Sequence, residues 1–177
     1  MKKSKISVII IAKNEEKKIG ECLESVGWAD EIIVVDNHSV DKTHEIAKEF
    51  KVRIIDASEK FSGKYTELRN IGLSYVKSDW VLYLDVDERV TPLLKKEIKK
   101  LILQHSGVGA FAIPRRNIIL GREMKHGGWW PDYVKRLFKI DKLKYWVGEL
   151  HEEPRYAGEI GHLTNPLVHI KHAKLSE

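Results

Sequence analysis

The chain has 177 residues, with 31 Lys or Arg and 26 Asp or Glu, so its formal net charge is +5. This length suits one domain with its own hydrophobic core, and the single cysteine, Cys22, excludes an internal disulfide. No apolar stretch approaches the roughly 20 residues of a membrane span, and the run 6–12 is too short and wrongly flanked for a signal peptide.

Apolar runs of strand length alternate with helical periodicity over the first part of the chain. Strands are predicted at 6–12, 31–35, 52–55 and 80–84. Helices are predicted from Glu15 to Val26, after a cap at Ser39 or Asp41, after the Ser62–Gly63 loop, and after a cap at Thr91. Cys22 falls on the apolar face of the first helix, where we expect it to pack. This order predicts an α/β fold, with a doubly wound, mostly parallel sheet and helices on both faces.

The character of the sequence changes after Gly107. Helical periodicity fades, while Gly, Pro, Trp and Arg become frequent in AFAIPRRN, GGWWPDY, KRLFKI and KYWVGELHEEP. We expect short strands and loops here, within the same single domain. A regular half followed by an irregular, aromatic-rich half suggests that residues 1–106 bind one ligand and residues 107–177 receive a second.

Three acidic residues follow the predicted strand 80–84. They are Asp85, Asp87 and Glu88, interrupted only by Val86. Carboxylates this close repel one another unless a cation lies among them, and Mg²⁺ and Mn²⁺ favour oxygen ligands. Ligands of open α/β sheets bind at the carboxyl ends of the strands. A solvated acidic turn is the alternative, but the buried strand before it favours a metal site.

Polar residues also follow the neighbouring strands. The second strand ends at Asp36, and the first continues into Ala12, Lys13, Asn14 and Glu15. These groups could hold a base and a ribose. The chain contains neither a G-x-G-x-x-G nor a G-x-x-x-x-G-K-[ST] loop, so a diphosphate would need another counter-charge. A cation on Asp87 would provide it.

Four segments together resemble glycosyltransferase family 2 with the GT-A fold, closest to the bacterial branch that adds sugars to lipopolysaccharide core. They are ISVIIIAKNEEKKIGECLESVGWADEIIVVDNHSVDKTHEIAKEF, LRNIGLSYVKSDWVLYLDVDERVTPLL, IPRRNIILGREMKHGGWWPDYVKRLF and VGELHEEP. They follow the family's order over nearly the whole chain. The resemblance implies a GT-A-type, Rossmann-like sheet with an irregular β-rich acceptor half. Relatives commonly continue beyond the position of Glu177, so we expect the acceptor half to be truncated.

The resemblance implies an inverting, metal-dependent transfer of a sugar from a nucleotide-diphosphate donor to a glycan or lipid-linked acceptor in cell-envelope polysaccharide synthesis. Mn²⁺ or Mg²⁺ would be held by Asp87, with Asp85 on the ribose and Arg69 near the base or diphosphate. The nucleotide pocket would be lined by Ala12, Asn14, Glu15, Asp36, Arg69 and Asp85. No Q-x-x-R-W motif is present, which implies a single transfer and not polymerisation.

An inverting transfer needs a base to accept the proton of the acceptor hydroxyl. The candidates are Asp132, Glu149 and Glu152. The pair His151–Glu152 matches the family's pattern, so Glu152 is the first choice and Asp132 the second, while a surface acid is the alternative for Glu152. His169 could complete the metal's shell or be an ordinary satisfied histidine. In a strand, His172 would face the opposite side from His169.

The aromatic and basic residues of the second half allow two interpretations each. Trp129, Trp130 and Tyr133 could stack on acceptor sugars or form core, and for Trp146 we expect core. The arginines could meet phosphate or lie on a solvated face; they are Arg115, Arg116 and Arg136.

Two other functions are compatible with parts of this sequence. A non-catalytic nucleotide-sugar or glycan binder on the same fold is the alternative. A Mg²⁺-dependent phosphotransferase of the haloacid dehalogenase type also uses D-x-D, but needs Thr or Val where Arg89 stands. Nucleic-acid binding would rest on net charge alone, and we expect none. We expect a cytoplasmic protein, with the option of peripheral contact at the inner membrane, and make no prediction of oligomeric state.

Overall fold

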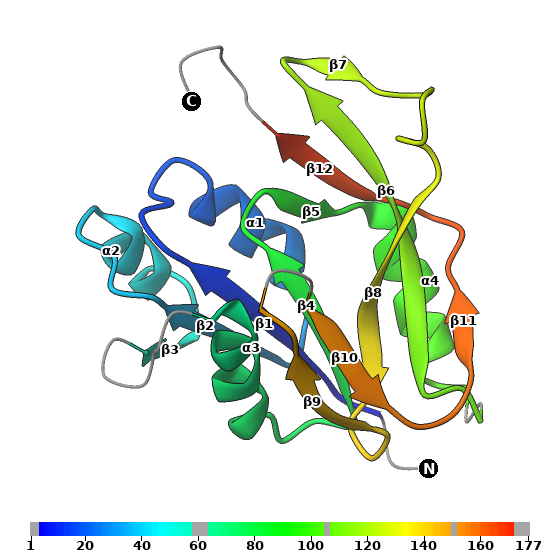
Figure 1. Ribbon diagram of the computed structural model, residues 1–177. Coiled ribbons are helices and arrows are strands. Elements are labelled where there is room, and N and C mark those ends of the chain that lie inside the picture. Colours follow the sequence, from blue (N-terminus) through cyan, green and yellow to red (C-terminus); the bar gives the residue numbers. More distant parts are fainter. Residues whose placement is uncertain (1–3, 58–63, 105–106, 150–151, 172–177) are drawn as a thin grey trace.

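The computed structural model describes residues 4–57, 64–104, 107–149 and 152–171, and within these ranges the chain forms a ten-stranded mixed sheet and a separate two-stranded sheet (Figure 1). The strands within these ranges are β1 (Ile6–Ala12), β2 (Glu31–Asp36), β3 (Arg53–Asp56), β4 (Trp80–Asp85), β5 (Glu88–Val90), β6 (Ala110–Ile119), β7 (Arg122–Glu123), β8 (Asp132–Lys139), β9 (Leu143–Val147), β10 (Glu153–Tyr156), β11 (Ile160–His162) and β12 (Leu167–Lys171). The helices are α1 (Ile19–Val26), α2 (Thr43–Lys48), α3 (Tyr65–Ser74) and α4 (Pro92–Leu101).

The first four strands form the parallel part of this sheet, in the order β3-β2-β1-β4. In the register, Ala12 lies opposite Asp36 and Ile11 lies opposite Asp85, so the carboxyl ends of β1, β2 and β4 meet at one edge. The four predicted strands are confirmed within one or two residues at each end. The prediction that the polar residues at the ends of these strands lie close together is confirmed.

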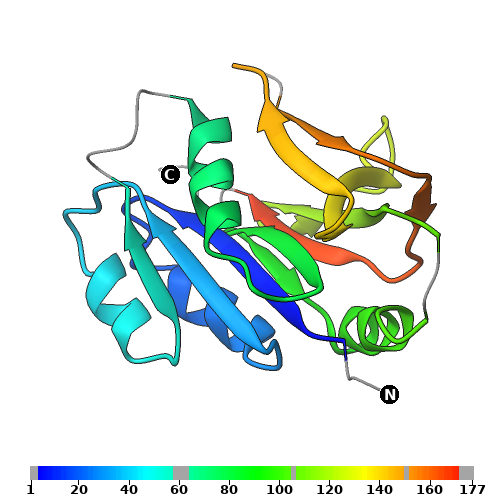
Figure 2. The same ribbon diagram turned by 90° about the horizontal axis from the view of Figure 1, so that it is seen from below.

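Helices and the β9–β10 hairpin cover opposite faces of the sheet. Helices α1, α2 and α4 pack on one face, where Leu23 and Leu94 belong to the same hydrophobic cluster as the β1 side chain Val8. Helix α3 and the hairpin pack on the other, where Leu68 and Trp146 join the same cluster as Ile9. Figure 2 shows the sheet between these two layers. The alternation of β1 side chains therefore supplies both cores.

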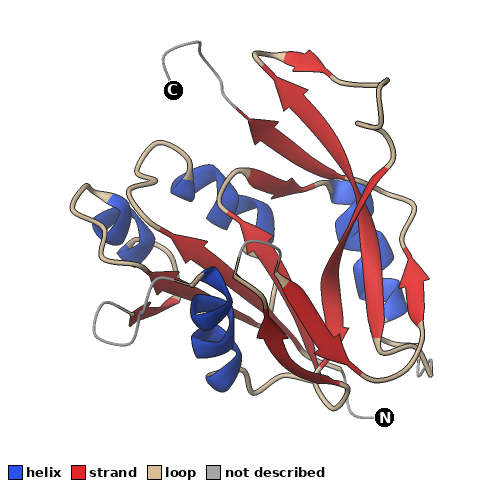
Figure 3. Cartoon of the chain, viewed as in Figure 1, coloured by secondary structure: helices blue, strands red, loops and turns tan. Residues whose placement is uncertain are grey.

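The second half joins the sheet through β8, which pairs antiparallel with both β4 and β6. The sheet continues in the order β8-β6-β12-β5, and β7 and β11 pair with β6. Figure 3 shows that the helices belong to the first half and that the described part of the second half is strand and loop. Our expectation of only short strands there was wrong, because β6 has ten residues. Pro114, Arg115 and Arg116 interrupt its apolar pattern. The strand nevertheless continues through them, because it pairs with β8 over residues 110–115 and with β12 over residues 115–119.

Two helix starts test the predicted caps. Helix α4 begins at Pro92, and the Thr91 hydroxyl accepts a hydrogen bond from the Leu94 amide at 3.1 Å, as predicted. Helix α1 begins at Ile19 and not at Glu15, because the Glu15 amide donates to the Thr43 hydroxyl at 2.7 Å and residues 15–18 form a turn. A hydrogen bond to the first residue of α2 thus replaces the helical start that we expected at Glu15.

The cap predicted for the next helix is only partly correct. Helix α2 begins at Thr43, whose amide donates to Asp41 at 2.9 Å, while the Ser39 hydroxyl donates to Asp36 at 2.6 Å. The Ser62–Gly63 loop lies outside the described residues. Within the described ranges, no helix is long and apolar enough to cross a membrane. Cys22 is fully buried as expected, and burial raises the pKa of its thiol to about 12.

The hairpin is tied to α3 by a two-way contact. The Asn70 side chain donates to the Trp146 carbonyl at 2.9 Å and accepts from the Trp146 amide at 2.8 Å. The Thr66 hydroxyl donates to the Gly148 carbonyl at 3.2 Å. Because β9 is fixed on α3 in this way, the side chains that follow it in sequence are positioned relative to the sheet edge.

Close packing of α3 on the sheet gives a stability prediction. A Cβ atom added at Gly72 would lie 2.7 Å from Ile9 Cγ2 and 3.1 Å from Val35 Cγ2. We expect Gly72→Ala to lower the free energy of unfolding by about 1–3 kcal/mol, measured by urea denaturation. Gly20→Ala in α1 is the matched control, since its nearest neighbour is Ile46 at 3.8 Å. The control should be neutral or stabilising by up to about 1 kcal/mol. Equal stability of the two variants would contradict this packing.

Candidate active site

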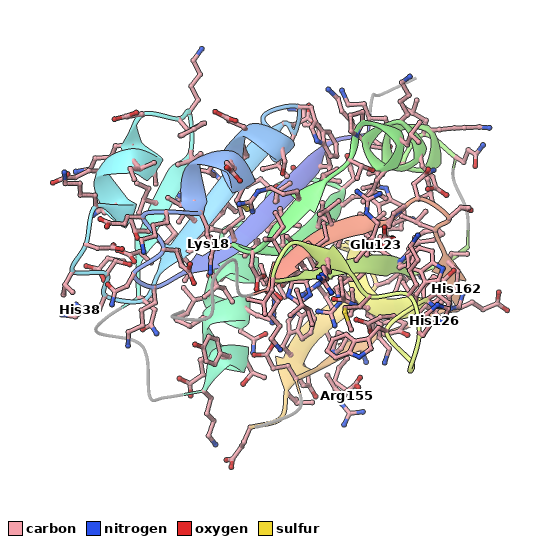
Figure 4. All side chains as sticks on the ribbon, turned by 90° about the horizontal axis from the view of Figure 1, so that it is seen from above. Lys18, His38, Glu123, His126, Arg155 and His162 are labelled. Carbon is pink, nitrogen blue, oxygen red and sulfur yellow. The ribbon has the colours of Figure 1, made fainter. Side chains whose placement is uncertain are left out.

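One cavity lies at the carboxyl ends of the parallel strands and a second lies beside it against β8, β9 and β10, and Arg69 lines both. The smaller cavity, about 250 Å³, is lined by residues that include Lys13, Glu15, Tyr65, Asp85, Asp87 and His169. The larger cavity, about 550 Å³, is lined by residues that include Arg115, Tyr133, Arg136, Trp146, Glu152 and Pro154. Figure 4 looks onto this end of the molecule, with Lys18 over the first half and Glu123 and His126 over the second.

The walls of the smaller cavity come from four separated parts of the sequence. Glu15 follows β1, Asp85 ends β4, and Asp87 lies in the turn between β4 and β5. Arg69 reaches in from α3, and His169 from β12. Burial raises the pKa of Glu15, Lys18 opposes this shift, and the nearby Asp87 charge adds to it. Sequence positions as far apart as 15 and 169 therefore meet at one sheet edge.

Arg69 forms the wall between the two cavities. Its Nε donates to the Glu152 carboxylate, and its other guanidinium edge donates to Asp85 Oδ1 at 3.2 Å. The guanidinium carbon lies 4.8 Å from the centre of the Trp146 ring and 5.7 Å from that of Tyr83. Stacking on aromatic faces stabilises a partly desolvated cation. The side chain is therefore held in place while its two acidic partners face different cavities.

A second buried arginine neutralises the acids at the end of β4. Arg136, from β8, donates to both Asp85 and Glu88, the latter at 2.9 Å. Burial alone would raise the pKa of Asp85, but the Arg136 and Arg69 charges outweigh it and hold this pKa well below its usual range. Glu88 is fully buried and accepts the Asp85 amide at 3.0 Å. Burial raises the pKa of Glu88 despite the opposing charge of Arg136.

The acidic triplet therefore divides into two kinds of group. Asp85 and Glu88 are paired with arginines, whereas Asp87 Oδ2 lies 3.2 Å from His169 Nε2. Nowhere in the described ranges do three or more His, Cys, Asp or Glu side chains form a ready-made metal cluster. Among the described His, Cys, Asp and Glu side chains, Asp87 and His169 are the pair at this edge that could bind a cation together, and a bound molecule could supply further ligands.

Asp132, the second candidate base, is held on one oxygen by three donors. Arg115 donates to Asp132 Oδ2 through Nε at 2.9 Å and is joined to it through its terminal nitrogen at 2.7 Å. Asn117 Nδ2 donates to the same oxygen at 3.2 Å. Arg115 also approaches Glu88 at 3.7 Å. Acids and arginines thus alternate in one chain that joins both candidate bases: Glu152, Arg69, Asp85, Arg136, Glu88, Arg115 and Asp132.

The remaining predicted nucleotide residues lie along the same edge but line neither of these two cavities. Ala12 ends β1, and its carbonyl accepts the Asn37 amide at 2.8 Å. Asn14 has a positive φ of 55° and accepts the Val40 amide at 2.8 Å. Asp36 accepts from the Ser39 hydroxyl. In the structure, Asn14 and Asp36 thus shape the loop between β2 and α2.

The other candidates of the second half separate into core and surface. Trp146 is 5% exposed and packs against Tyr83, as expected of a core residue. Trp129 and Trp130 are exposed by 37% and 43%. Glu149, the third candidate base, is 73% exposed in its side chain and pairs with Lys64 at 2.5 Å. Residues 151 and 172, both histidines, lie outside the described residues.

Sequence reasoning missed two contributors, Tyr65 and Asn117. Tyr65 lines the smaller cavity from the first turn of α3. Asn117 is 1% exposed and binds both Asp132 and His169, from which it is 15 and 52 residues away in sequence. No local pattern marks such a residue, because its neighbours come from β8 and β12.

Comparison with known proteins fixes the family. Residues 7–155 match the family described as glycosyl transferase family 2. The chain belongs to glycosyltransferase family 2. LpsC, a lipopolysaccharide core biosynthesis glycosyltransferase of Rhizobium meliloti, is 26% identical over 97% of this chain and 65% of its own length. This match agrees with the predicted branch of the family. The chain spans about a third of the length of curated Rickettsia glycosyltransferases that it also matches.

Solved glycosyltransferase structures share the fold of this family 2 chain. Residues 1–349 of S. aureus TarS superpose with a TM-score of 0.68 at 21% identity, over 94% of this chain and 60% of that one. Glucosyl-3-phosphoglycerate synthase of Mycobacterium tuberculosis, in complex with Mn²⁺, UDP and glucosyl-3-phosphoglycerate, gives 0.58 at 19% identity, over 78% of this chain and 57% of that one. The predicted GT-A fold is confirmed, and the phosphotransferase alternative is set aside.

The buried arginine gives a prediction about stability. Removing one partner of a buried ion pair leaves the other charge uncompensated, which costs about 3–5 kcal/mol. We expect Arg136→Met to lower the free energy of unfolding by this amount, measured by chemical denaturation. Lys135→Met is the control on the same strand, because Lys135 pairs with Glu153 at 2.9 Å in solvent. An exposed pair contributes less than about 1 kcal/mol. Similar losses in the two variants would show that Arg136 does not stabilise this edge.

Proposed function

We propose that the protein is an inverting glycosyltransferase that moves a sugar from a nucleoside-diphosphate donor to a glycan or lipid-linked acceptor, with help from a divalent cation. The observation that carries the proposal is the pair of cavities divided by Arg69. One contains the strand-end acids and His169, and the other contains Glu152. An inverting transfer needs this arrangement, because the leaving group and the attacking hydroxyl lie on opposite sides of the sugar.

The smaller cavity is the proposed donor site. Asp85 would meet the ribose, while Lys13 and Arg69 offer positive charge to a diphosphate in the absence of a glycine-rich phosphate loop. Tyr65 is 53% exposed and offers a ring face for a base. Asp36, Asn14 and Ala12 would complete the pocket through the loop that they shape. Relatives support a nucleotide donor, since the mycobacterial synthase binds UDP.

A divalent cation fits beside Asp87 and His169. The 3.2 Å between Asp87 Oδ2 and His169 Nε2 is close to the edge of an octahedron with ligands at about 2.1 Å, which is about 3 Å. The Asp87 carboxylate suits Mn²⁺ or Mg²⁺, whereas the His169 imidazole is a transition-metal ligand and therefore favours Mn²⁺ over Mg²⁺. The bound ion would neutralise charge on the leaving diphosphate. Two protein ligands leave positions for diphosphate oxygens and water.

Glu152 is the proposed base and Asp132 the second choice. Arg69 holds Glu152 at the mouth of the larger cavity, on the acceptor side. Three donors already converge on Asp132 Oδ2, which leaves less room there for an acceptor hydroxyl. In the reaction, the acceptor oxygen would form its bond to the anomeric carbon while the bond to the diphosphate breaks, and Glu152 would take the hydroxyl proton.

The proposed setting is synthesis of lipopolysaccharide core or a related cell-envelope glycan. The support is the match to LpsC over nearly the whole chain. Tyr133 is exposed and lines the larger cavity, where it offers a ring face for an acceptor sugar; Trp129, four residues earlier in the chain, is exposed as well. A cytoplasmic location with peripheral membrane contact stays a prediction.

Cation dependence is the first test of this function. We expect UDP to bind more tightly in Mn²⁺ than in EDTA, because no glycine-rich loop is present to hold the diphosphate. Isothermal titration calorimetry measures both affinities. Asp87→Asn should lose most of the difference, whereas Asp141→Asn, a change at an exposed acid paired with Lys139, should keep it. Equal UDP affinities in Mn²⁺ and EDTA would remove the cation from the mechanism.

The base is tested by neutral, isosteric substitutions. Glu152→Gln can still accept a hydrogen bond from Arg69 but cannot take a proton, so we expect kcat to fall about 10²–10⁴-fold with donor Kd nearly unchanged. Nucleoside diphosphate release, with acceptors found by screening core oligosaccharides, measures turnover. Glu153→Gln is the adjacent control, on an exposed acid. If Asp132→Asn loses turnover and Glu152→Gln does not, the base is Asp132.

A further inference from the structure

The His169 ring lies between two polar side chains that have different chemistry. Its Nδ1 is 2.6 Å from Asn117 Oδ1, and its Nε2 is 3.2 Å from Asp87 Oδ2. Strand β12 places the ring there, because it pairs with β6 on one side and β5 on the other (Figure 1). The register sets His169 directly opposite Asn117. The ring is 12% exposed in its side chain, so protein groups determine its hydrogen bonding.

The surroundings of Asn117 fix which way its amide points. Its nitrogen lies 3.2 Å from the Trp129 carbonyl and 3.2 Å from Asp132 Oδ2. Both of these oxygens are acceptors, so the amide NH₂ must face them. The Asn117 oxygen is then left to face His169 Nδ1. An amide oxygen cannot donate, so the hydrogen of this 2.6 Å contact belongs to Nδ1.

This assignment decides what the other ring nitrogen offers. In a neutral imidazole only one nitrogen carries a hydrogen, so Nε2 presents a lone pair to the Asp87 carboxylate. Two acceptors 3.2 Å apart repel each other unless a positive charge lies between them. The positive charge could be a proton, giving an imidazolium–carboxylate pair, or a metal ion that both atoms bind.

We propose that Asn117 is a positioning residue that fixes His169 as the Nδ1–H tautomer, so that Nε2 and Asp87 together bind the divalent cation of the donor site. The proposal rests on the cation in the proposed function. Metal-binding histidines usually donate their second N–H to a protein acceptor, and loss of that acceptor costs about 10–100-fold in metal affinity. Asn117 would act through His169 and touch neither the cation nor the substrate.

The tautomer can be measured on the unaltered protein without metal. Nitrogen-15 NMR of the histidine rings at alkaline pH, where an imidazole is neutral, distinguishes the two nitrogens. The chain has 8 histidines, so the His169 signals would be assigned by their loss in His169→Gln. We expect a protonated Nδ1 and an unprotonated Nε2. A His169 ring that carries its hydrogen on Nε2 would overturn the proposal whatever the activity of the protein.

Metal affinity provides the second test, with binding as its readout. Electron paramagnetic resonance measures Mn²⁺ binding to the UDP complex. Asn117→Leu removes the acceptor and should weaken Mn²⁺ binding about 10–100-fold. The exchanged pair, Asn117→Asp with Asp132→Asn, keeps an acceptor opposite His169 Nδ1 and a donor between the two side chains, but loses the hydrogen bond to the Trp129 carbonyl. We expect it to bind Mn²⁺ more tightly than Asn117→Leu and less tightly than the wild type, and an affinity no better than that of Asn117→Leu would contradict a role for the acceptor at position 117.

The outcomes separate this proposal from the proposed function. Circular dichroism and UDP affinity in EDTA establish that each variant is folded. Wild-type Mn²⁺ affinity in Asn117→Leu would overturn the role of Asn117 and leave the cation in place. If the wild-type UDP complex binds no Mn²⁺, both the cation of the proposed function and the role of Asn117 are contradicted. Glycosyl transfer itself would not be contradicted, because positively charged side chains could neutralise the diphosphate instead.

Discussion

The edge of the sheet depends on one buried ion-pair interaction, that of Arg136 with Asp85 and Glu88. Two carboxylates at the end of a buried strand would repel each other and would lose hydration, and neither cost is offset within β4 itself. The compensating charge comes from β8, the strand that also carries Leu137 and Phe138 into the core and joins the two halves of the sheet. A residue of the second half, Arg136, therefore neutralises the negative charge of two acids of the first half.

This charge balance gives the acids of the D-x-D segment different surroundings. Asp85 is committed to arginines and is held ionised, so it can orient a polar ligand but has little freedom to move. Asp87 lies in the turn that follows β4, where its carboxylate is 3.2 Å from the His169 imidazole and close enough to Glu15 to raise the pKa of that residue. Two residues that look equivalent in sequence thus have different partners, because different strands supply those partners.

The sequence predicted most of the first half because its signals are local. Apolar runs located β1, β2 and β4, and Thr91 with Pro92 located the start of α4. The predicted start of α1 was wrong because two side chains distant in sequence, Asp41 before α2 and Thr43 at its start, accept hydrogen bonds from the amides of residues 16 and 15. Helix prediction from apolar spacing and caps considers only neighbouring residues, so it does not account for acceptors from distant parts of the chain.

The partners within the site could not be predicted, since they depend on strand order. The contact of His169 with Asp87 spans 82 positions and requires β12 to insert between β5 and β6. Strand-end acids are visible in a sequence, but which arginine meets which acid is settled only by register. The roles of Glu152 and Asp132 stay predictions, although the structure places both at ends of one chain of charges.

Arg69 has a thermodynamic consequence, because one guanidinium bonds to an acid in each cavity. A ligand in one cavity that changes the position or charge of this side chain also changes the free energy of binding in the other. Such coupling is reciprocal: the factor by which the first ligand alters the affinity of the second equals the factor by which the second alters that of the first. The two cavities therefore cannot have independent affinities unless neither ligand disturbs Arg69.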